Sequence, residues 1–77
     1  MAEDTLDISG DLCPMTLVKT KLRLEELAVG DLLTIRLRDG EARTNVPRSL
    51  EEHGQAVVSA RAVDDGCWEV VVRKERD

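Results

Sequence analysis

The amino-acid sequence predicts a single α/β (α+β) domain over residues 1–77. We expect a two-layer sandwich in which a four-stranded mixed sheet carries two helices on one face. Three observations predict this class. A strand–helix–strand pattern opens the chain, a second short helix follows, and two strands joined by a tight turn end it. The predicted order is therefore β-α-β-α-β-β.

The first half of the chain has the pattern of a strand, a helix and a second strand. Alternating polar and apolar residues indicate a strand at 5–9. A helix is expected from Pro14 to about residue 28, because proline is favoured at the first helical position, and Gly30 ends it. The second strand covers 32–37. The apolar residues expected on one face of this strand are Leu33, Ile35 and Leu37, and the core stripe of the helix is Leu17, Thr20, Leu24, Leu27 and Ala28.

The second half predicts a short helix and a hairpin. A turn is expected at 38–41, followed by Asn45 as the N-cap of a helix that has Pro47 in its first turn and runs to His53. The remaining elements are strands at 56–63 and 67–73 and a hairpin turn at 64–66. A strand–helix–strand unit forms a parallel pair through a right-handed crossover, whereas a hairpin is antiparallel. The predicted sheet is therefore mixed.

Charge and composition argue against several classes of function. The net charge is −5 and the only aromatic residue is Trp68, whereas a nucleic-acid-binding protein needs a basic face. We therefore expect no direct nucleic-acid partner. No apolar run approaches the ~20 residues of a membrane span, and the acidic N-terminus is unlike a signal peptide, so we expect a cytoplasmic location and no membrane partner. One histidine and two separated cysteines make a metal site unexpected.

Cys13 is the candidate reactive residue. It immediately precedes Pro14 and is expected at the N-cap of the first helix. Unpaired N–H groups of a first helical turn and the positive end of the helix dipole both favour a thiolate, and they lower a cysteine pKa below its free value of ~8.5. Pro14 sets the helix start, and the N–H groups of Met15 and Thr16 are the expected anion donors. The alternative is that Cys13 is a small buried apolar residue.

Three segments resemble the TusA/SirA-like family of sulfur carriers. Residues 6–14 (Leu-Asp-Ile-Ser-Gly-Asp-Leu-Cys-Pro) resemble the opening strand and the Cys-Pro helix start of the family. Val29-Gly30-Asp31 resembles its turn after the first helix, and Thr44-Asn45-Val46-Pro47 resembles its entry to the second helix. The resemblance covers nearly the whole chain. It implies the fold described above, a two-layer sandwich with a four-stranded mixed sheet.

The same resemblance implies sulfur-carrier (sulfurtransferase) chemistry at Cys13. The motif cysteine of the family accepts sulfane sulfur as a persulfide and relays it, without a cofactor, to an acceptor protein. The implied donor is a cysteine desulfurase or a rhodanese. The implied destinations are tRNA thiolation, molybdenum-cofactor biosynthesis, and sulfur oxidation or reduction.

Two residues depart from the family pattern. Thr16 stands where the family has a second proline, and Leu12 stands where many members have arginine. Thr16 restores a backbone N–H and adds a hydroxyl, and both are expected to point toward a sulfur anion. The alternative is that Thr16 faces solvent. Leu12 removes a cation that would favour a thiolate.

A second apolar stripe on the first helix consists of Met15, Val18 and Leu22. One interpretation is contact with the second helix, through Val46 and Leu50. The other is a docking surface for a sulfur donor, with Lys19 among the basic residues that steer an acidic partner.

Cys67 begins the fourth strand. If the third strand runs parallel to the first, Cys67 lies at the same end of the sheet as Cys13, where it is a candidate for resolving a Cys13 persulfide. The alternative is an ordinary strand residue. Three functions thus follow from the sequence: a sulfur carrier, a regulatory or scaffold module that binds a partner protein, and a redox module that pairs Cys13 with Cys67.

Overall fold

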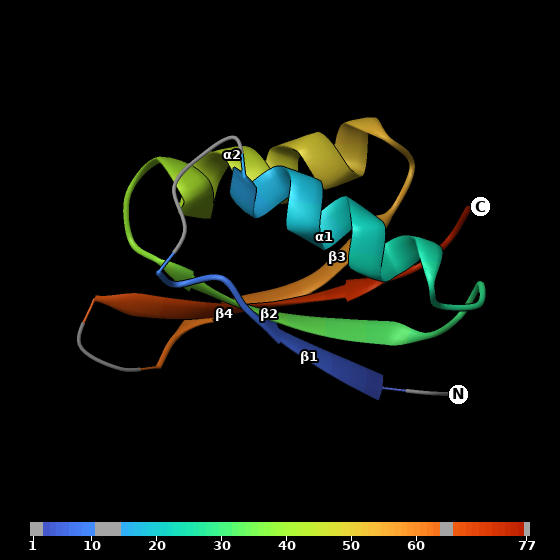
Figure 1. Ribbon diagram of the computed structural model, residues 1–77, viewed down its shortest axis with the longest axis horizontal. Coiled ribbons are helices and arrows are strands. Elements are labelled where there is room, and N and C mark those ends of the chain that lie inside the picture. The colour runs from blue at the N-terminus through green and yellow to red at the C-terminus, as the bar shows by residue number, and fades with distance from the viewer. Residues whose placement is uncertain (1–2, 11–14, 64–65, 77) are drawn as a thin grey trace.

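The computed structural model of the chain describes residues 3–10, 15–63 and 66–76 (Figure 1). Its elements follow the predicted order β-α-β-α-β-β. They are β1 (Glu3–Asp7), α1 (Met15–Glu25), β2 (Leu32–Arg38), α2 (Glu41–Glu52), β3 (Ala56–Ala62) and β4 (Cys67–Arg73).

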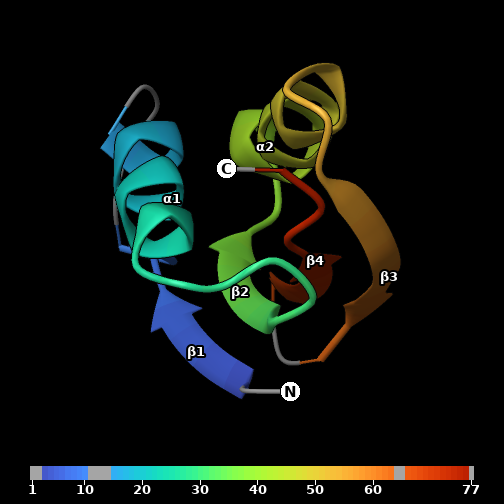
Figure 2. The same ribbon diagram turned by 90° about the vertical axis from the view of Figure 1, so that its right-hand side faces the viewer.

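The four strands form one mixed sheet in the spatial order β1-β2-β4-β3. β1 and β2 are parallel, and β4 pairs antiparallel with both β2 and β3. β1, β2 and β3 therefore run in the same direction, and β4 runs against them. Figure 2 shows both helices on one side of the sheet, with α1 on the side of β1 and α2 on the side of β3. The predicted two-layer sandwich is confirmed.

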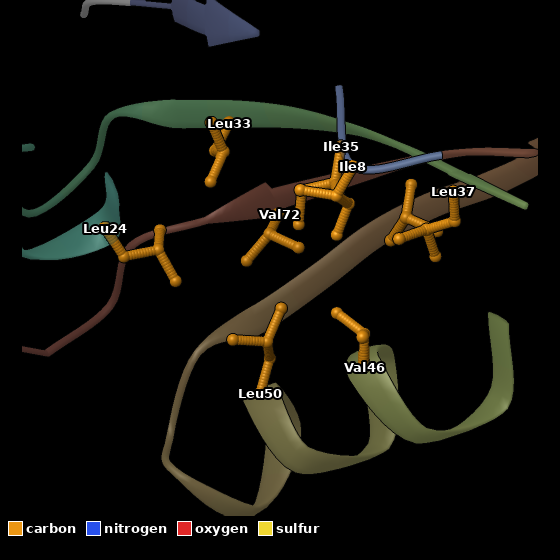
Figure 3. Close-up of a cluster of buried hydrophobic side chains, with 9 residues drawn as sticks. Ile8, Leu24, Leu33, Ile35, Leu37, Val46, Leu50 and Val72 are labelled. Atoms are coloured by element: carbon orange, nitrogen blue, oxygen red, sulfur yellow. The ribbon is translucent and has the colours of Figure 1, made fainter. Parts of the chain in front are cut away.

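The core lies between β2 and the two helices. Leu33, Ile35 and Leu37 alternate along β2 and are fully buried, as predicted. Fully burying an aliphatic side chain of this size contributes roughly 1.5–3 kcal/mol, so this strand supplies a large share of the stability. Figure 3 shows these side chains meeting residues of both helices. The other core residues are Ile8, Leu24, Val46, Leu50, Val70 and Val72.

The opposite face of the sheet is charged. Asp7, Arg36, Glu69 and Arg61 lie opposite one another in register across the four strands, and Arg61 pairs with Glu69 at 3.3 Å. Opposite charges on neighbouring strands support the pairing. Because this face is polar and the other is aliphatic, both helices pack on the same side.

Helix α1 ends three residues before the predicted end of the range 14–28. The N–H of Leu27 donates to the carbonyl of Leu24 at 3.1 Å, a three-residue spacing that tightens the last turn. Gly30 then reverses the chain with a φ of 97°. Ala28 lies beyond the helix and is exposed, so the prediction that it belongs to the core stripe is wrong.

Helix α2 begins earlier than the sequence indicated. Gly40 is its N-cap, with a φ of 129° and no side-chain cap bond. Asn45 is therefore not the N-cap, Pro47 lies in the helix interior, and the predicted turn at 38–41 ends one residue sooner. Proline at this position removes one N–H that would bond the carbonyl of Arg43, but the helix continues on both sides. The misleading signal was an Asn-Val-Pro segment that is typical of helix starts.

The strand ends differ from the predictions by one or two residues. β1 ends at Asp7, two residues before the predicted end of 5–9, but Ile8 is still buried and its N–H donates to the carbonyl of Arg36 at 3.0 Å. β3 contains a register shift between Val57 and Ser59, which leaves Val58 more than half exposed. β4 has its predicted bounds. The core-forming residues of the strands are thus placed as expected.

We predict that truncation to alanine lowers the stability of the fold strongly at one leucine of the helices and hardly at all at another. Leu50 is 1% exposed and Leu22 is 57% exposed. Leu50→Ala should lower the free energy of unfolding by about 2–5 kcal/mol, and Leu22→Ala should change it by no more than about 0.5 kcal/mol. Urea unfolding followed by circular dichroism measures both. Equal losses in the two variants would contradict the placement of the core.

Candidate functional site

The predicted reactive segment falls at the junction of β1 and α1. Cys13 and Pro14 lie outside the described residues, as does the side chain of Met15. The structure describes both flanks, which are Gly10 on one side and the first turn of α1 on the other. The described surroundings of the site are therefore the elements that hold these two flanks.

One end of the sandwich holds the first turn of α1 and Cys67. β1, β2 and β3 end there, and α1, α2 and β4 begin there. We call this end the carboxyl edge of the sheet. Figure 1 shows the two helices starting over the same end of the sheet and running in the same direction. Both helix N-termini, which carry partial positive charge, thus lie at the edge where β1 ends.

A hydrogen-bonded turn leads the chain out of β1. The Asp7 carboxylate accepts the N–H of Ser9 at 3.0 Å and its hydroxyl at 2.7 Å. The Ser9 hydroxyl, the Ser9 N–H and the charge of Arg36 together hold the pKa of Asp7 below its usual value. Because folding lowers this pKa, the turn is stabilised at neutral pH, and that contribution is lost as the pH falls through the lowered pKa.

The first turn of α1 is anchored by two buried threonines. The side chains of Thr16 and Thr20 are both fully buried. The Thr20 hydroxyl donates to the carbonyl of Thr16 at 2.8 Å. Among the described residues no buried side-chain nitrogen or oxygen lacks a hydrogen-bond partner. The alternative in which Thr16 faces solvent is therefore wrong, and the residue that replaces the family's second proline is part of the packed interior.

An arginine–tryptophan contact at the carboxyl edge has no signature in the sequence. The Arg43 guanidinium lies 3.7 Å from the centroid of the Trp68 ring and 3.4 Å from the Asp39 carboxylate. A guanidinium over an indole is a favourable cation–π contact. The N–H of Asp39 also donates to the carbonyl of Gly66 at 2.7 Å, which joins the turn before α2 to the β3–β4 connection. An arginine thus lies at this edge even though Leu12 replaces the arginine expected before Cys13.

Val18 and Leu22, the two residues of the second apolar stripe whose side chains the structure describes, face solvent. Val18 is 44% exposed and Leu22 is 57% exposed, whereas Val46 and Leu50 of α2 are buried in the core. The interpretation that this stripe packs against α2 is wrong. Val18 and Leu22 instead form an exposed apolar patch, which we call the α1 patch. The docking role of Val18, Leu22 and Lys19 stays a prediction.

A groove runs beside the α1 patch toward β1. Its volume is about 270 Å³, and its lining includes Leu22, Lys19 and the half-buried Leu6 of β1. Arg23 forms one wall and donates to the Asp4 carboxylate at 2.7 Å. This hydrogen bond is the main reason that the pKa of Asp4 is lowered. The ion pair therefore joins α1 to the edge strand β1 beside the groove.

Cys67 lies at the carboxyl edge but on the other face of the sheet. β3 runs parallel to β1, so β4 begins at the end of the sheet where β1 ends. Trp68, Val70 and Val72 alternate along β4 on the helix-covered face, which directs the half-buried Cys67 to the uncovered face. This orientation counts against pairing with a residue of the helix layer. A resolving role for Cys67 stays a prediction.

The described part of the chain holds neither a membrane-spanning helix nor a metal-binding cluster. No helix there is long and apolar enough to cross a membrane. No group of three or more histidine, cysteine, aspartate or glutamate side chains is arranged to hold a metal ion.

Comparisons with known proteins agree with one another. Residues 4–74 match the family model described as Sulfurtransferase TusA. A "Putative sulfur carrier protein" of Archaeoglobus fulgidus is 38% identical over 74 residues, which is 96% of this chain and 84% of that protein. The Escherichia coli protein named "Putative sulfur carrier protein TsuB" is 30% identical over 90% of this chain and 92% of its own length.

A solved structure also matches the fold. The crystal structure of the SirA-like protein from Desulfitobacterium hafniense superposes with a TM-score of 0.82 and 26% sequence identity. The match covers 95% of this chain and 99% of that chain. The four-stranded sheet with two helices is therefore the fold of a SirA-like protein.

We predict that Thr16→Pro raises the pKa of the Cys13 thiol. Proline removes the Thr16 N–H, which the sequence assigns as an anion donor in the first turn. Thiolate absorbance against pH, measured in a Cys67→Ser background, gives the pKa. Thr16→Val is the matched control, because it keeps the N–H and the buried shape while it removes the hydroxyl. An unchanged or lower pKa in Thr16→Pro would rule out the donor role of this N–H.

Proposed function

Because the chain belongs to the TusA family of sulfurtransferases, we propose that it is a sulfur carrier whose working atom is the Cys13 sulfur. In this proposal Cys13 accepts a sulfane sulfur from a donor protein, holds it as a persulfide and passes it to an acceptor protein. The observation that carries the proposal is that the Cys-Pro pair directly precedes α1 in the sequence, and that α1 begins at the carboxyl edge of the sheet.

The transfer needs no oxidant and no cofactor. The Cys13 thiolate attacks the terminal sulfur of a persulfide on the donor. A new S–S bond forms on Cys13, the S–S bond of the donor breaks, and the donor leaves as a thiolate. In the second step an acceptor thiolate attacks the terminal sulfur on Cys13 in the same way, and Cys13 is released as a thiolate. The sulfane sulfur keeps its oxidation state throughout.

The described surroundings support an anionic sulfur before α1. The helix begins at Met15, so the N–H groups of Met15 and Thr16 belong to its first turn, in which N–H groups have no partner within the helix. The N-terminus of α2 lies at the same edge. A thiolate and a persulfide anion both gain from such donors, and a lower pKa increases the thiolate fraction at neutral pH.

The α1 patch is the proposed docking surface for the donor protein. Val18 and Leu22 are exposed on the helix that Cys13 precedes, and Lys19 lies between them in sequence. Exposed apolar residues with a charged rim are typical of protein interfaces. We expect the donor to be a cysteine desulfurase or a rhodanese and the location to be cytoplasmic.

The loading of Cys13 is directly testable by mass. Incubation with a cysteine desulfurase and cysteine should add about 32 Da, one sulfur atom, to the protein, as measured by intact-mass spectrometry. Cys13→Ser should not gain this mass, and Cys67→Ser should gain it like the wild type. Loading that persists in Cys13→Ser and disappears in Cys67→Ser would contradict the proposal.

The docking surface is tested by separating protein-mediated loading from chemical loading. Val18→Ala/Leu22→Ala should slow sulfur transfer from the desulfurase by about tenfold, the effect of losing one or two interface anchors. Loading by a small inorganic polysulfide should be unchanged, because it needs no docking.

The matched control is Val29→Ala/Val58→Ala, which truncates two apolar residues that are 55% and 54% exposed and lie off the patch. This control should transfer sulfur at the wild-type rate. Equal rates in the two double variants would remove the α1 patch from the proposal.

A further inference from the structure

A cavity lies between the C-terminal halves of the two helices. Its volume is about 190 Å³, and it is partly open to solvent. Figure 2 shows the segment that follows β4 passing between the ends of α1 and α2. Its lining residues are Lys21, Leu24, Glu25, Leu50, His53, Gln55, Lys74 and Arg76. None of the residues assigned to sulfur transfer is among them.

The cavity is cationic in an acidic protein. Its lining carries the charges of Lys21, Lys74 and Arg76 against the single carboxylate of Glu25, whereas the whole chain has a net charge of −5. Within the described part of the chain, no ion pair joins Lys21, Glu25 or Arg76 to another residue. Two cations that face one cavity without a carboxylate partner favour an anion there.

A hydrogen-bond network fixes the cations around this cavity. The His53 ring lies with Nδ1 2.7 Å from the carbonyl of Ser49, to which it donates. Its Nε2 then accepts from the Lys21 ammonium at 3.3 Å. Lys74 is 4% exposed and donates to the carbonyl of Leu27 at 2.6 Å. The carbonyl groups of Ser49 and Leu27 are thus already bonded, which reduces their repulsion of an anion.

The C-terminal segment is held in place as the remaining wall. The Gln55 side-chain oxygen accepts the N–H groups of Glu75 and Arg76, at 2.7 and 3.2 Å. Its amide nitrogen donates to the carbonyl of Arg76 at 3.1 Å. Arg76 also lies against Gly54, where an added Cβ would overlap the Arg76 Cδ. Gln55 and Gly54 therefore position the Arg76 side chain at the cavity.

We propose that this cavity binds a small organic carboxylate with a short branched aliphatic body. Leu24 and Leu50 give an apolar floor, and Lys21 and Arg76 give a cationic rim. A ligand that satisfies both needs an anionic head and an apolar tail. The planar guanidinium of Arg76 matches a carboxylate with two parallel hydrogen bonds. The proposal stands independently of sulfur transfer.

The test is a titration of the ¹⁵N-labelled full chain with 4-methylpentanoate, in which binding is monitored by NMR. Acetate and inorganic phosphate are titrated as comparison probes. We expect saturable shifts at residues that line the cavity and weaker binding of acetate, which has no body to cover the floor. Lys21→Gln and Arg76→Gln should each raise the dissociation constant about tenfold, as expected for the loss of one charge-assisted hydrogen bond. Glu25→Gln should lower it, because a repelling carboxylate is removed.

Matched controls come from the exposed pair Arg48–Glu52 of α2, which does not line the cavity. Arg48→Gln and Glu52→Gln make the same charge changes and should leave the dissociation constant unchanged, as should Cys13→Ser. The proposal is overturned if Arg48→Gln weakens binding as much as Lys21→Gln. It is equally overturned if acetate or phosphate binds as tightly as 4-methylpentanoate, or if no shifts saturate.

Discussion

The parallel pairing of β1 with β2 is the constraint on which the rest of the structure depends. Two parallel strands need a crossover, and α1 is that crossover, so it must begin where β1 ends and return over the same face. The chain repeats this geometry through α2, because β3 also runs parallel to β2. Both helix N-termini therefore meet at one edge of the sheet. In open α/β sheets, that edge is where ligands bind, and it is the edge at which β1 ends and α1 begins.

The aliphatic face of β2 makes this arrangement stable in a chain of 77 residues. Leu33, Ile35 and Leu37 are fully buried between the helices, while the reverse face of the sheet carries a row of opposite charges. A domain this small has no spare core to enclose a substrate. Its chemistry must therefore take place at the surface, on a segment positioned by a rigid scaffold. A carrier that receives sulfur from one protein and gives it to another fits these limits.

The sequence allowed prediction of the features that depend on local periodicity and chain order. Alternation predicted β1 and β2, a tight turn predicted the hairpin of β3 and β4, and the element order predicted the parallel pair. Prediction from the sequence failed for features that depend on contacts between residues far apart in the chain. Asn45 and Pro47 imitate a helix start, but α2 begins after Gly40. The contact of Arg43 with Trp68 joins residues from two elements and has no signature in either.

Helical spacing also left the roles of two faces of α1 unresolved. The spacing placed Val18 and Leu22 on one face of α1, but it did not show whether that face packs against another element. Both residues are exposed. Thr16 is fully buried. Its burial could not be predicted from the sequence, because the burial of a first-turn residue depends on how the helix packs on the sheet. Cys13 and Pro14 were assigned from the sequence alone, and that assignment stays a prediction.

The central claim is that Cys13 is held as a reactive thiolate before α1, and its alkylation rate tests this most directly. Iodoacetamide labelling across a pH series, followed by peptide mass spectrometry, reports Cys13 and Cys67 in the same molecules, so that Cys67 is an internal reference. The account predicts that the labelling of Cys13 reaches half its maximal rate at a pH clearly below the value of ~8.5 for free cysteine. A midpoint at or above that value, with Cys13 labelled more slowly than Cys67, would contradict it and favour a structural cysteine in a partner-binding module.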